Sequence, residues 1–215
     1  MKKAIVVPIK TNNQRLPGKN TMLLGDIPLY AHLFKTLQKT KIDVYIDSSD
    51  DEILKIAKEY NFKTIKRPVS LNTPETSGND LIYHALENID CDVLGQFFVT
   101  TPFLKIQTIE KAFKLLEDNI EKISSSFGLY PVYDRFWLDS KPVNHNYKNL
   151  VGTQYMNPLM RESGFYVFKK ETFLKEGSRI TNDFITFEVE EKECIDIDTL
   201  EDFIYASAIY NGGLI

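Results

Sequence analysis

Three cationic side chains follow the first apolar segment closely enough to bind one anion. Ala4–Val7 is a run of strand-forming residues that Pro8 stops, and Lys10, Arg15 and Lys19 come next. A strand that leads into a basic loop containing Gly and Pro can bind the phosphates of a nucleoside triphosphate. Neither a Walker sequence nor a dinucleotide fingerprint is present, and loop cations are often only solvated. The loop is a candidate triphosphate site.

Two carboxylates near the other end of the chain could bind a cation. Asp196 and Asp198 alternate with isoleucines, and alternate side chains of an extended segment point to one side. Oxygen ligands suit Mg²⁺, which typically joins one or two carboxylates to substrate phosphates. Alternatively, Asp198 only caps the helix predicted to follow it. The pair is a candidate Mg²⁺ site.

The hydrophobic pattern alternates between strands and helices along the whole chain. Runs typical of strands lie at 4–7, 44–46, 62–65, 93–99, 122–129, 164–168, 183–189 and 194–198. Helical spacing is found at 28–37, 51–60, 78–88, 106–116, 172–176 and 199–210. This alternation predicts an α/β fold with a doubly wound, mostly parallel sheet. Ligands of such sheets bind beyond the carboxyl ends of the strands, where the basic loop begins.

Length and composition narrow the class of protein. With 215 residues, 43% of them hydrophobic, a single domain with a full core is expected. A net charge of -4 argues against a nucleic-acid surface, and no apolar run approaches the roughly 20 residues of a membrane span. The N-terminus lacks the apolar core of a signal peptide. Cys91 and Cys194 lack a CxxC partner, so we expect reduced thiols in a cytoplasmic protein.

Both candidate motifs resemble those of the CMP-sugar synthetases, the cytidylyltransferases that activate sialic acids, related nonulosonic acids and Kdo. Val7–Lys10 and Arg15–Asn20 stand where that family has I-P-A-R and R-L-P-G-K, at the same spacing. Ile195–Phe203 is similar to its I-D-I-D-T-x-x-D-L segment, whose aspartates bind Mg²⁺. The resemblance implies a Rossmann-like nucleotidyltransferase that moves CMP from CTP to an acidic sugar, such as a sialic acid-like nonulosonic acid, with release of pyrophosphate. It implies Mg²⁺ on Asp196 and Asp198.

The same resemblance assigns the nucleotide side of the site. Lys10, Arg15 and Lys19 would bind the triphosphate, and Asn20 would contact the edge of the cytosine. Ser77, within a weaker match to T-x-S-S-x-D, would donate to the cytidine or to a phosphate. Lys10 stands where the family has arginine, so the charge is kept but the bidentate fork is lost.

The acceptor side departs further from the family pattern. Phe97–Pro102 stands where the family has L-L-Q-P-T-S-P, so Phe98 replaces a glutamine that contacts the acceptor sugar. Phe98 and Thr100 are therefore candidates for the acceptor side. Gln154 and Arg161 are further candidates, and Arg161 falls on the arginine of the family's R-x-N-G-A-I-Y-I segment.

These departures leave other functions open. The acceptor could be a phosphonate or a phosphorylated alcohol instead of a sugar. The D-x-D pair also occurs in sugar-nucleotide glycosyltransferases, although usually at mid-chain. A third possibility is a protein that binds a nucleotide without catalysis.

Residues 130–160 are polar, aromatic and longer than an ordinary connection. In the family the corresponding segment reaches across a dimer, and aromatic enrichment is typical of an interface. We therefore expect an insertion in a single domain spanning 1–215, and a homodimer.

Overall fold

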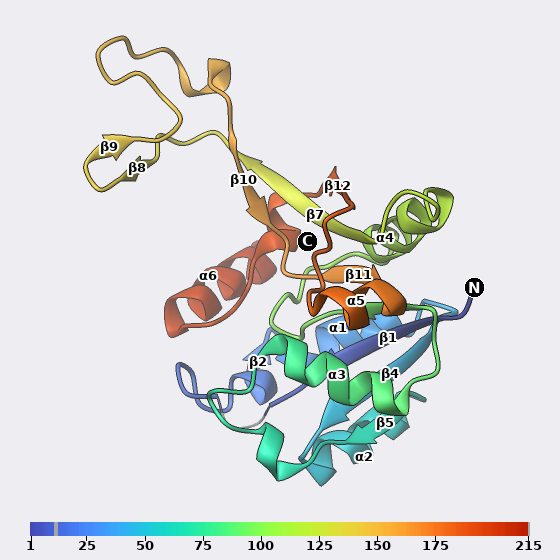
Figure 1. The fold of residues 1–215 in the computed structure, drawn as a ribbon. Helices are drawn as coiled ribbons and strands as arrows, with labels where there is room; N and C mark the ends of the chain where they lie inside the picture. Colours follow the sequence, from blue (N-terminus) through green and yellow to red (C-terminus); the bar gives the residue numbers. More distant parts are fainter. Residues whose placement is uncertain (11–12, 215) are drawn as a thin grey trace.

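A computed structural model describes residues 1–10 and 13–214 (Figure 1). Its centre is an eight-stranded sheet in the order β10-β7-β11-β6-β1-β4-β5, with β12 paired to β7. The strands are β1 (Lys3–Pro8), β4 (Asp43–Ser48), β5 (Lys63–Lys66), β6 (Val93–Gln96), β7 (Ser125–Val132), β10 (Leu159–Glu162), β11 (Tyr166–Lys169) and β12 (Phe184–Glu188). A short hairpin of β2 (Leu23–Leu24) and β3 (Ile27–Pro28) follows β1 in the sequence and is separate from this sheet.

Helices cover both faces of this sheet, as β1 makes clear. The helices are α1 (Leu29–Leu37), α2 (Asp51–Glu59), α3 (Gly78–Asn88), α4 (Ile106–Asp118), α5 (Lys170–Glu176) and α6 (Leu200–Asn211). The side chains of β1 alternate between two cores: Ile5 and Val7 pack in one cluster with α1, α2 and α4, whereas Ala4 and Val6 pack in another with α3 and α5. The doubly wound α/β prediction is confirmed.

Strand direction determines which residues meet at the edge of the sheet. β6, β1, β4 and β5 run parallel, so their carboxyl ends share one edge. β11 runs antiparallel to β6, and Tyr166 is the register partner of Gln96. The beginning of β11 therefore lies at the same edge as the end of β6.

Three predicted strands differ from the structure. Residues 194–198 form no strand; the 3-10 helix η4 (Glu191–Cys194) precedes an irregular segment held by a 2.9 Å hydrogen bond from Ile197 N to Thr100 O. β6 ends at Gln96, because the chain turns there and Thr101 N bonds back to Phe98 O at 3.2 Å. β7 extends to Val132 because its last residues pair with β10.

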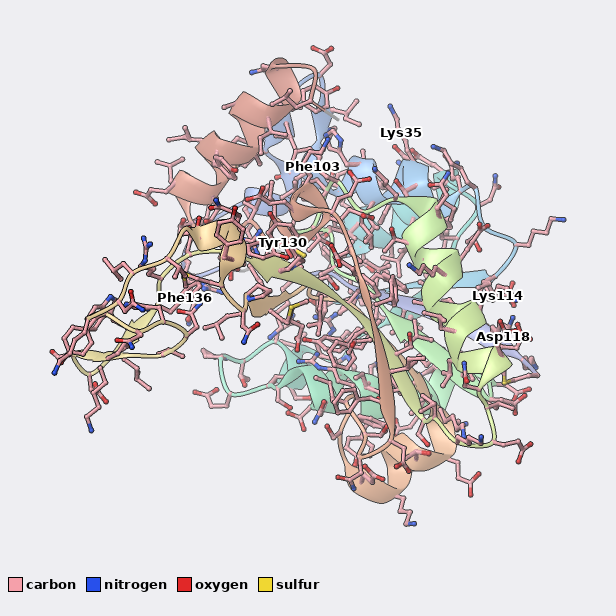
Figure 2. All side chains as sticks on the ribbon, turned by 90° about the horizontal axis from the view of Figure 1, so that it is seen from above. Lys35, Phe103, Lys114, Asp118, Tyr130 and Phe136 are labelled. Carbon is pink, nitrogen blue, oxygen red and sulfur yellow. The ribbon has the colours of Figure 1, made fainter. Side chains whose placement is uncertain are left out.

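Between β7 and β10 the chain forms an arm, residues 133–158, that extends away from the sheet (Figure 1). Its strands β8 (Trp137–Leu138) and β9 (Lys141–Pro142) pair only with each other, and η3 (Thr153–Tyr155) follows them. Figure 2 shows Phe136 on the arm and Tyr130 nearer the body of the protein. Residues 130–132 and 159–160, expected within the insertion, belong instead to β7 and β10.

The two cysteines are free and buried. Burial raises the pKa of the Cys91 thiol and of the Cys194 thiol to about 11. Both thiols are therefore protonated near neutral pH and poorly nucleophilic. None of the helices within residues 1–10 and 13–214 has the length and apolar character needed to cross a bilayer.

Candidate active site

A glycine turn directs Lys19 into the protein. Gly18 has a φ of 71°, a left-handed conformation that glycine adopts without strain, and Lys19 N bonds to Leu16 O at 3.2 Å. The 3-10 helix η1 (Lys19–Thr21) begins there, and the Lys19 side chain is buried. Its ammonium donates to Ile197 O at 2.7 Å and to Asp198 Oδ1 at 2.9 Å. The basic loop and the carboxylate segment are thus in direct contact.

Asp198 also forms an ion pair with a second cation of the basic loop, Arg15. Arg15 Nη2 lies 2.7 Å from Asp198 Oδ2, so each carboxylate oxygen faces a different cation. The Arg15 side chain is 65% exposed. Because exposed ion pairs contribute about 1 kcal/mol or less, a stronger anion can displace this contact.

The alternative role for Asp198, as a cap of the last helix, is wrong. Thr199 occupies the N-cap of α6: its hydroxyl accepts from Asp202 N at 3.2 Å, and its own N donates to Asp202 Oδ2 at 2.8 Å. This reciprocal capping box satisfies backbone N–H groups at the start of α6. The Asp198 carboxylate is therefore not used as the cap and is available to bind other groups.

The two motifs line one cavity of about 380 Å³ at the carboxyl edge of the sheet. Its lining includes Pro8, Lys10, Asn13, Arg15, Lys19, Asn20, Phe98, Thr100, Gly164, Tyr166, Arg179, Asp196 and Asp198. A second cavity of about 310 Å³ shares Lys10, Asn13, Arg15 and Lys19 with it and extends toward residues 72–74. The predicted phosphate-binding cations therefore lie where two adjoining cavities meet.

Asn20 carries an unsatisfied acceptor in this cavity. Its side chain is buried, its Nδ2 donates to Lys10 O at 2.6 Å, and its Oδ1 has no partner among the described residues. A buried acceptor without a donor costs about 1–3 kcal/mol, so an N–H group of a ligand would stabilise it.

A buried ion pair between Arg67 and Asp47, which is not predicted from the sequence, acts on Lys10 through its charge. The Lys10 ammonium lies 3.4 Å from Thr73 O, and burial together with the charge of Arg67 lowers the pKa of Lys10. Arg67 itself is fully buried against Asp47: its Nε lies 3.1 Å from both carboxylate oxygens, and its Nη2 donates to Asp47 O at 2.7 Å. Arg67 is the first residue after β5, so its ion pair with Asp47 fixes the start of the loop that leads to Thr73.

Asp196 and Asp198 form a donor set suited to a hard cation. Burial raises the pKa of Asp196, a hydrogen bond from Thr100 opposes this, and the charge of Asp198 adds to it. The side chain nonetheless reaches solvent through the open cavity. Within the described part of the chain, no three His, Cys, Asp or Glu side chains form a metal-binding group. Two carboxylates fit Mg²⁺ when the nucleotide supplies further oxygen ligands.

The structure does not bring every predicted residue to this cavity. Ser77 caps α3 by a capping box with Asp80 and does not line the cavity, although residues 76 and 78 do. Gln154 lies in η3 on the arm and is exposed. Arg161 lies exposed on β10, with its guanidinium 5.4 Å from the centre of the Tyr130 ring. Phe98 does line the cavity, as Thr100 does.

Arg179 and Tyr166 also line this cavity, and neither is predicted as a site residue from the sequence. Arg179 follows Gly177, the left-handed residue that ends α5, and it lines the cavity beside Tyr166 and above Gln96. A cation two residues after a glycine that ends a helix was the available signal. That signal is too common to identify a site without the tertiary structure.

The chain matches the sequence profile of the family described as cytidylyltransferase over residues 4–206. It is 23% identical over 222 residues to an N-acylneuraminate cytidylyltransferase of Streptococcus agalactiae serotype III, covering 95% of this chain and 52% of that protein. It is 22% identical over 226 residues to a pseudaminic acid cytidylyltransferase of Campylobacter jejuni, covering 98% and 97%. The chain thus spans about half the length of the first relative and nearly all of the second.

Solved structures show the same fold at low sequence identity. A CMP:2-keto-3-deoxy-manno-octonic acid synthetase complexed with CTP superposes with a TM-score of 0.74 and 14% identity, covering 99% of this chain and 100% of that one. A 4-diphosphocytidyl-2C-methyl-D-erythritol synthase from Anaerococcus prevotii gives a TM-score of 0.68 at 14% identity, covering 98% of each chain. The profile match across almost the whole length, together with this fold, establishes that the chain belongs to the cytidylyltransferase family.

Proposed function

We propose that this protein transfers CMP from CTP to a hydroxyl of an acidic sugar, a sialic acid-like nonulosonic acid, and releases pyrophosphate. One observation carries the proposal: the cationic loop and the carboxylate pair line a single cavity and meet at the 2.9 Å contact between Lys19 and Asp198. The relatives, which act on N-acylneuraminate and on pseudaminic acid according to their names, support an acidic sugar as the acceptor.

The chemistry needs positioning and charge neutralisation more than covalent participation by the protein. The acceptor oxygen attacks the α-phosphorus, the bond from that phosphorus to the bridging oxygen breaks, and pyrophosphate leaves while the hydroxyl proton passes to solvent. Lys10, Arg15 and Lys19 would bind the triphosphate and stabilise the departing pyrophosphate. The cytosine amino group would donate to Asn20 Oδ1, which has no partner among the described residues.

Asp196 and Asp198 would hold Mg²⁺ together with phosphate oxygens. When bound, the ion neutralises phosphate charge and lowers the cost of the developing negative charge. In this structure Asp198 pairs with Arg15 and Lys19. When the nucleotide binds, Arg15 and Lys19 would therefore leave the Asp198 carboxylate and bind the triphosphate.

The test measures pyrophosphate release with each of the four ribonucleoside triphosphates against a panel of 2-keto-3-deoxy sugar acids. Release with CTP and a nonulosonic acid is expected, at a rate well above that without acceptor. A glycosyltransferase would release a nucleoside diphosphate from a sugar nucleotide. A non-catalytic binding protein would bind CTP tightly and release no pyrophosphate with any acceptor.

A non-sugar acceptor is the second candidate, favoured by Phe98 in the cavity wall where the family pattern has glutamine. A phosphonate and a phosphorylated alcohol therefore belong in the same panel. Faster pyrophosphate release with either of them than with every sugar acid would replace the first proposal.

A homodimer in the cytoplasm is proposed as the working form. A two-stranded hairpin such as β8–β9 is marginally stable alone in water, and the arm exposes apolar side chains of Trp137, Leu138, Tyr147, Leu150 and Val151. A second copy that covers the arm would bury them. CTP as donor and the two free thiols support a cytoplasmic location.

A further inference from the structure

Arg179 presents a fixed guanidinium with unused donors to the larger cavity. Its Nη1 donates to Gln96 Oε1 at 2.7 Å, and its Cζ lies 4.3 Å from the centre of the Tyr166 ring. Of the five N–H donors of the guanidinium, this is the only one that meets an acceptor among the described residues. No carboxylate of those residues lies within 4 Å of it, so its charge is not neutralised by an ion pair in the described part of the chain.

The surrounding elements hold this side chain in place. Gln96 and Tyr166 are buried register partners at the end of β6 and the start of β11, so the acceptor and the stacking ring come from the rigid sheet. The Tyr166 hydroxyl is itself hydrogen-bonded to Glu162. A Cβ at Gly78, the first residue of α3, would lie 2.5 Å from Arg179 Nη1. The glycine therefore leaves the space that the guanidinium occupies.

Arg179 is separate from the cations expected to bind the triphosphate. Lys10, Arg15 and Lys19 line both cavities, whereas Arg179 lines only the larger one, together with Asp196 and Phe98. A stacked arginine with its fork directed into a cavity is suited to bidentate binding of a carboxylate. The acceptor of the proposed reaction supplies such a group.

We propose that Arg179 binds the carboxylate of the acceptor and thereby selects a 2-keto acid sugar. This inference rests on the proposed function. In a cyclic 2-keto-3-deoxy sugar acid, the reacting hydroxyl is on the carbon next to the carboxylate, so a bidentate grip on the carboxylate also fixes the nucleophile. Arg161, which the family resemblance favours for the acceptor, lies outside the cavity of the protomer.

The first test compares Arg179→Gln with Arg179→Lys. Arg179→Gln is expected to raise the KM for the sugar acid about 30- to 100-fold, because a charge-assisted bidentate contact is lost. Arg179→Lys should recover part of that loss, and the Kd for CTP measured without acceptor should stay unchanged in both. Lys175→Gln, which removes an exposed cation from the neighbouring helix α5, is the matched control and should behave as wild type.

The second test changes the ligand. Wild type should strongly prefer the sugar acid over the same sugar carrying a neutral C1 carboxamide, and Arg179→Gln should lose most of that preference. Direct titration of the acid without CTP gives a readout independent of turnover, so a chain that binds the acid through Arg179 but releases no pyrophosphate would disprove the proposed function alone. Unchanged binding of the acid in a folded Arg179→Gln variant would overturn the inference. So would a loss of acid binding in Arg161→Gln that Arg179→Gln does not show.

Discussion

The ammonium of Lys19 lies 2.9 Å from the carboxylate of Asp198, although the two residues are 179 positions apart in sequence. Arg15 binds the other oxygen of the same carboxylate. Asp198 thus pairs with two cations that a triphosphate would bind. This pairing leads to separate predictions for the two partners.

Lys19→Ala should lower turnover about 100-fold, because a preorganised cation is lost from the phosphate site. It should also lower the free energy of unfolding by about 1–3 kcal/mol, since the Ile197 carbonyl loses its buried donor. Steady-state kinetics and denaturant unfolding measure the two effects. Lys114→Ala, at the exposed Lys114–Asp118 pair on α4 (Figure 2), should change stability by about 0.5 kcal/mol or less and leave turnover intact.

Asp198→Asn should separate nucleotide binding from catalysis. Turnover with Mg²⁺ should fall about 100-fold, because one of the two proposed metal ligands becomes a neutral amide. CTP binding measured in EDTA should become up to about fivefold tighter, because Arg15 and Lys19 no longer have to leave a carboxylate. Weaker metal-free binding together with normal turnover would contradict this release of Arg15 and Lys19 from Asp198.

The affinity for CTP should fall with rising pH at values where an ordinary lysine is still charged. Burial and the neighbouring charge of Arg67 lower the pKa of Lys10 in the free protein. A lysine is cationic below its pKa, and the triphosphate requires the cation, so affinity is lost as pH rises through this lowered value, below about 10.4. Calorimetric Kd values between pH 7.5 and 10 measure the effect. Lys10→Arg should bind CTP with little pH dependence, and an identical slope in both proteins would exclude Lys10 as its source.

The sequence predicted the fold because its helices carry both periodicity and start signals. Asp50 accepts hydrogen bonds from Glu52 N and Ile53 N at the start of α2, the helix predicted at 51–60. The error at 194–198 has a packing cause: Ile195 and Ile197 alternate as in a strand, yet they are buried in a cluster with α6. Alternating burial alone does not require a paired strand.

The candidate site was predictable where it follows strand ends and unpredictable where it depends on packing between distant segments. Lys19 and Asp198 belong to two motifs in a known order, and the fold brings them into contact. Ser77 matched a motif, but its hydroxyl caps the start of α3 and does not line the cavity. Arg179 belongs to no motif, and only the register of β6 and β11 beneath it reveals its position.

Asp47→Asn should lower the free energy of unfolding by about 3–5 kcal/mol, because it leaves the guanidinium of Arg67 buried without its counter-charge. Denaturant titration is the measurement. Replacing both residues by apolar ones, Asp47→Leu with Arg67→Met, should recover part of the loss. The control is Lys63→Ala at the exposed Lys63–Asp43 pair on the same two strands, which should cost about 1 kcal/mol or less. Equal losses in Asp47→Asn and Lys63→Ala would contradict this account of the buried pair.

The arm should mediate dimerisation. Multi-angle light scattering at micromolar concentration is expected to give twice the mass of one chain. Adding charges to the arm by Trp137→Arg with Leu138→Asp should shift the protein to monomer, because both exposed apolar side chains would be covered by the second copy. Leu174→Asp, at an exposed leucine on α5, is the control and should remain a dimer. A monomeric wild-type protein would remove the dimer from the proposal.

The transfer of CMP to an acidic sugar in the Lys19–Asp198 cavity can be followed by phosphorus NMR of wild-type protein with CTP, Mg²⁺ and a nonulosonic acid. We expect the three CTP resonances to disappear together as one phosphodiester signal and pyrophosphate grow in equal amounts. CTP that stays intact with every sugar acid, or that yields a phosphodiester only with a non-sugar acceptor, would contradict this transfer.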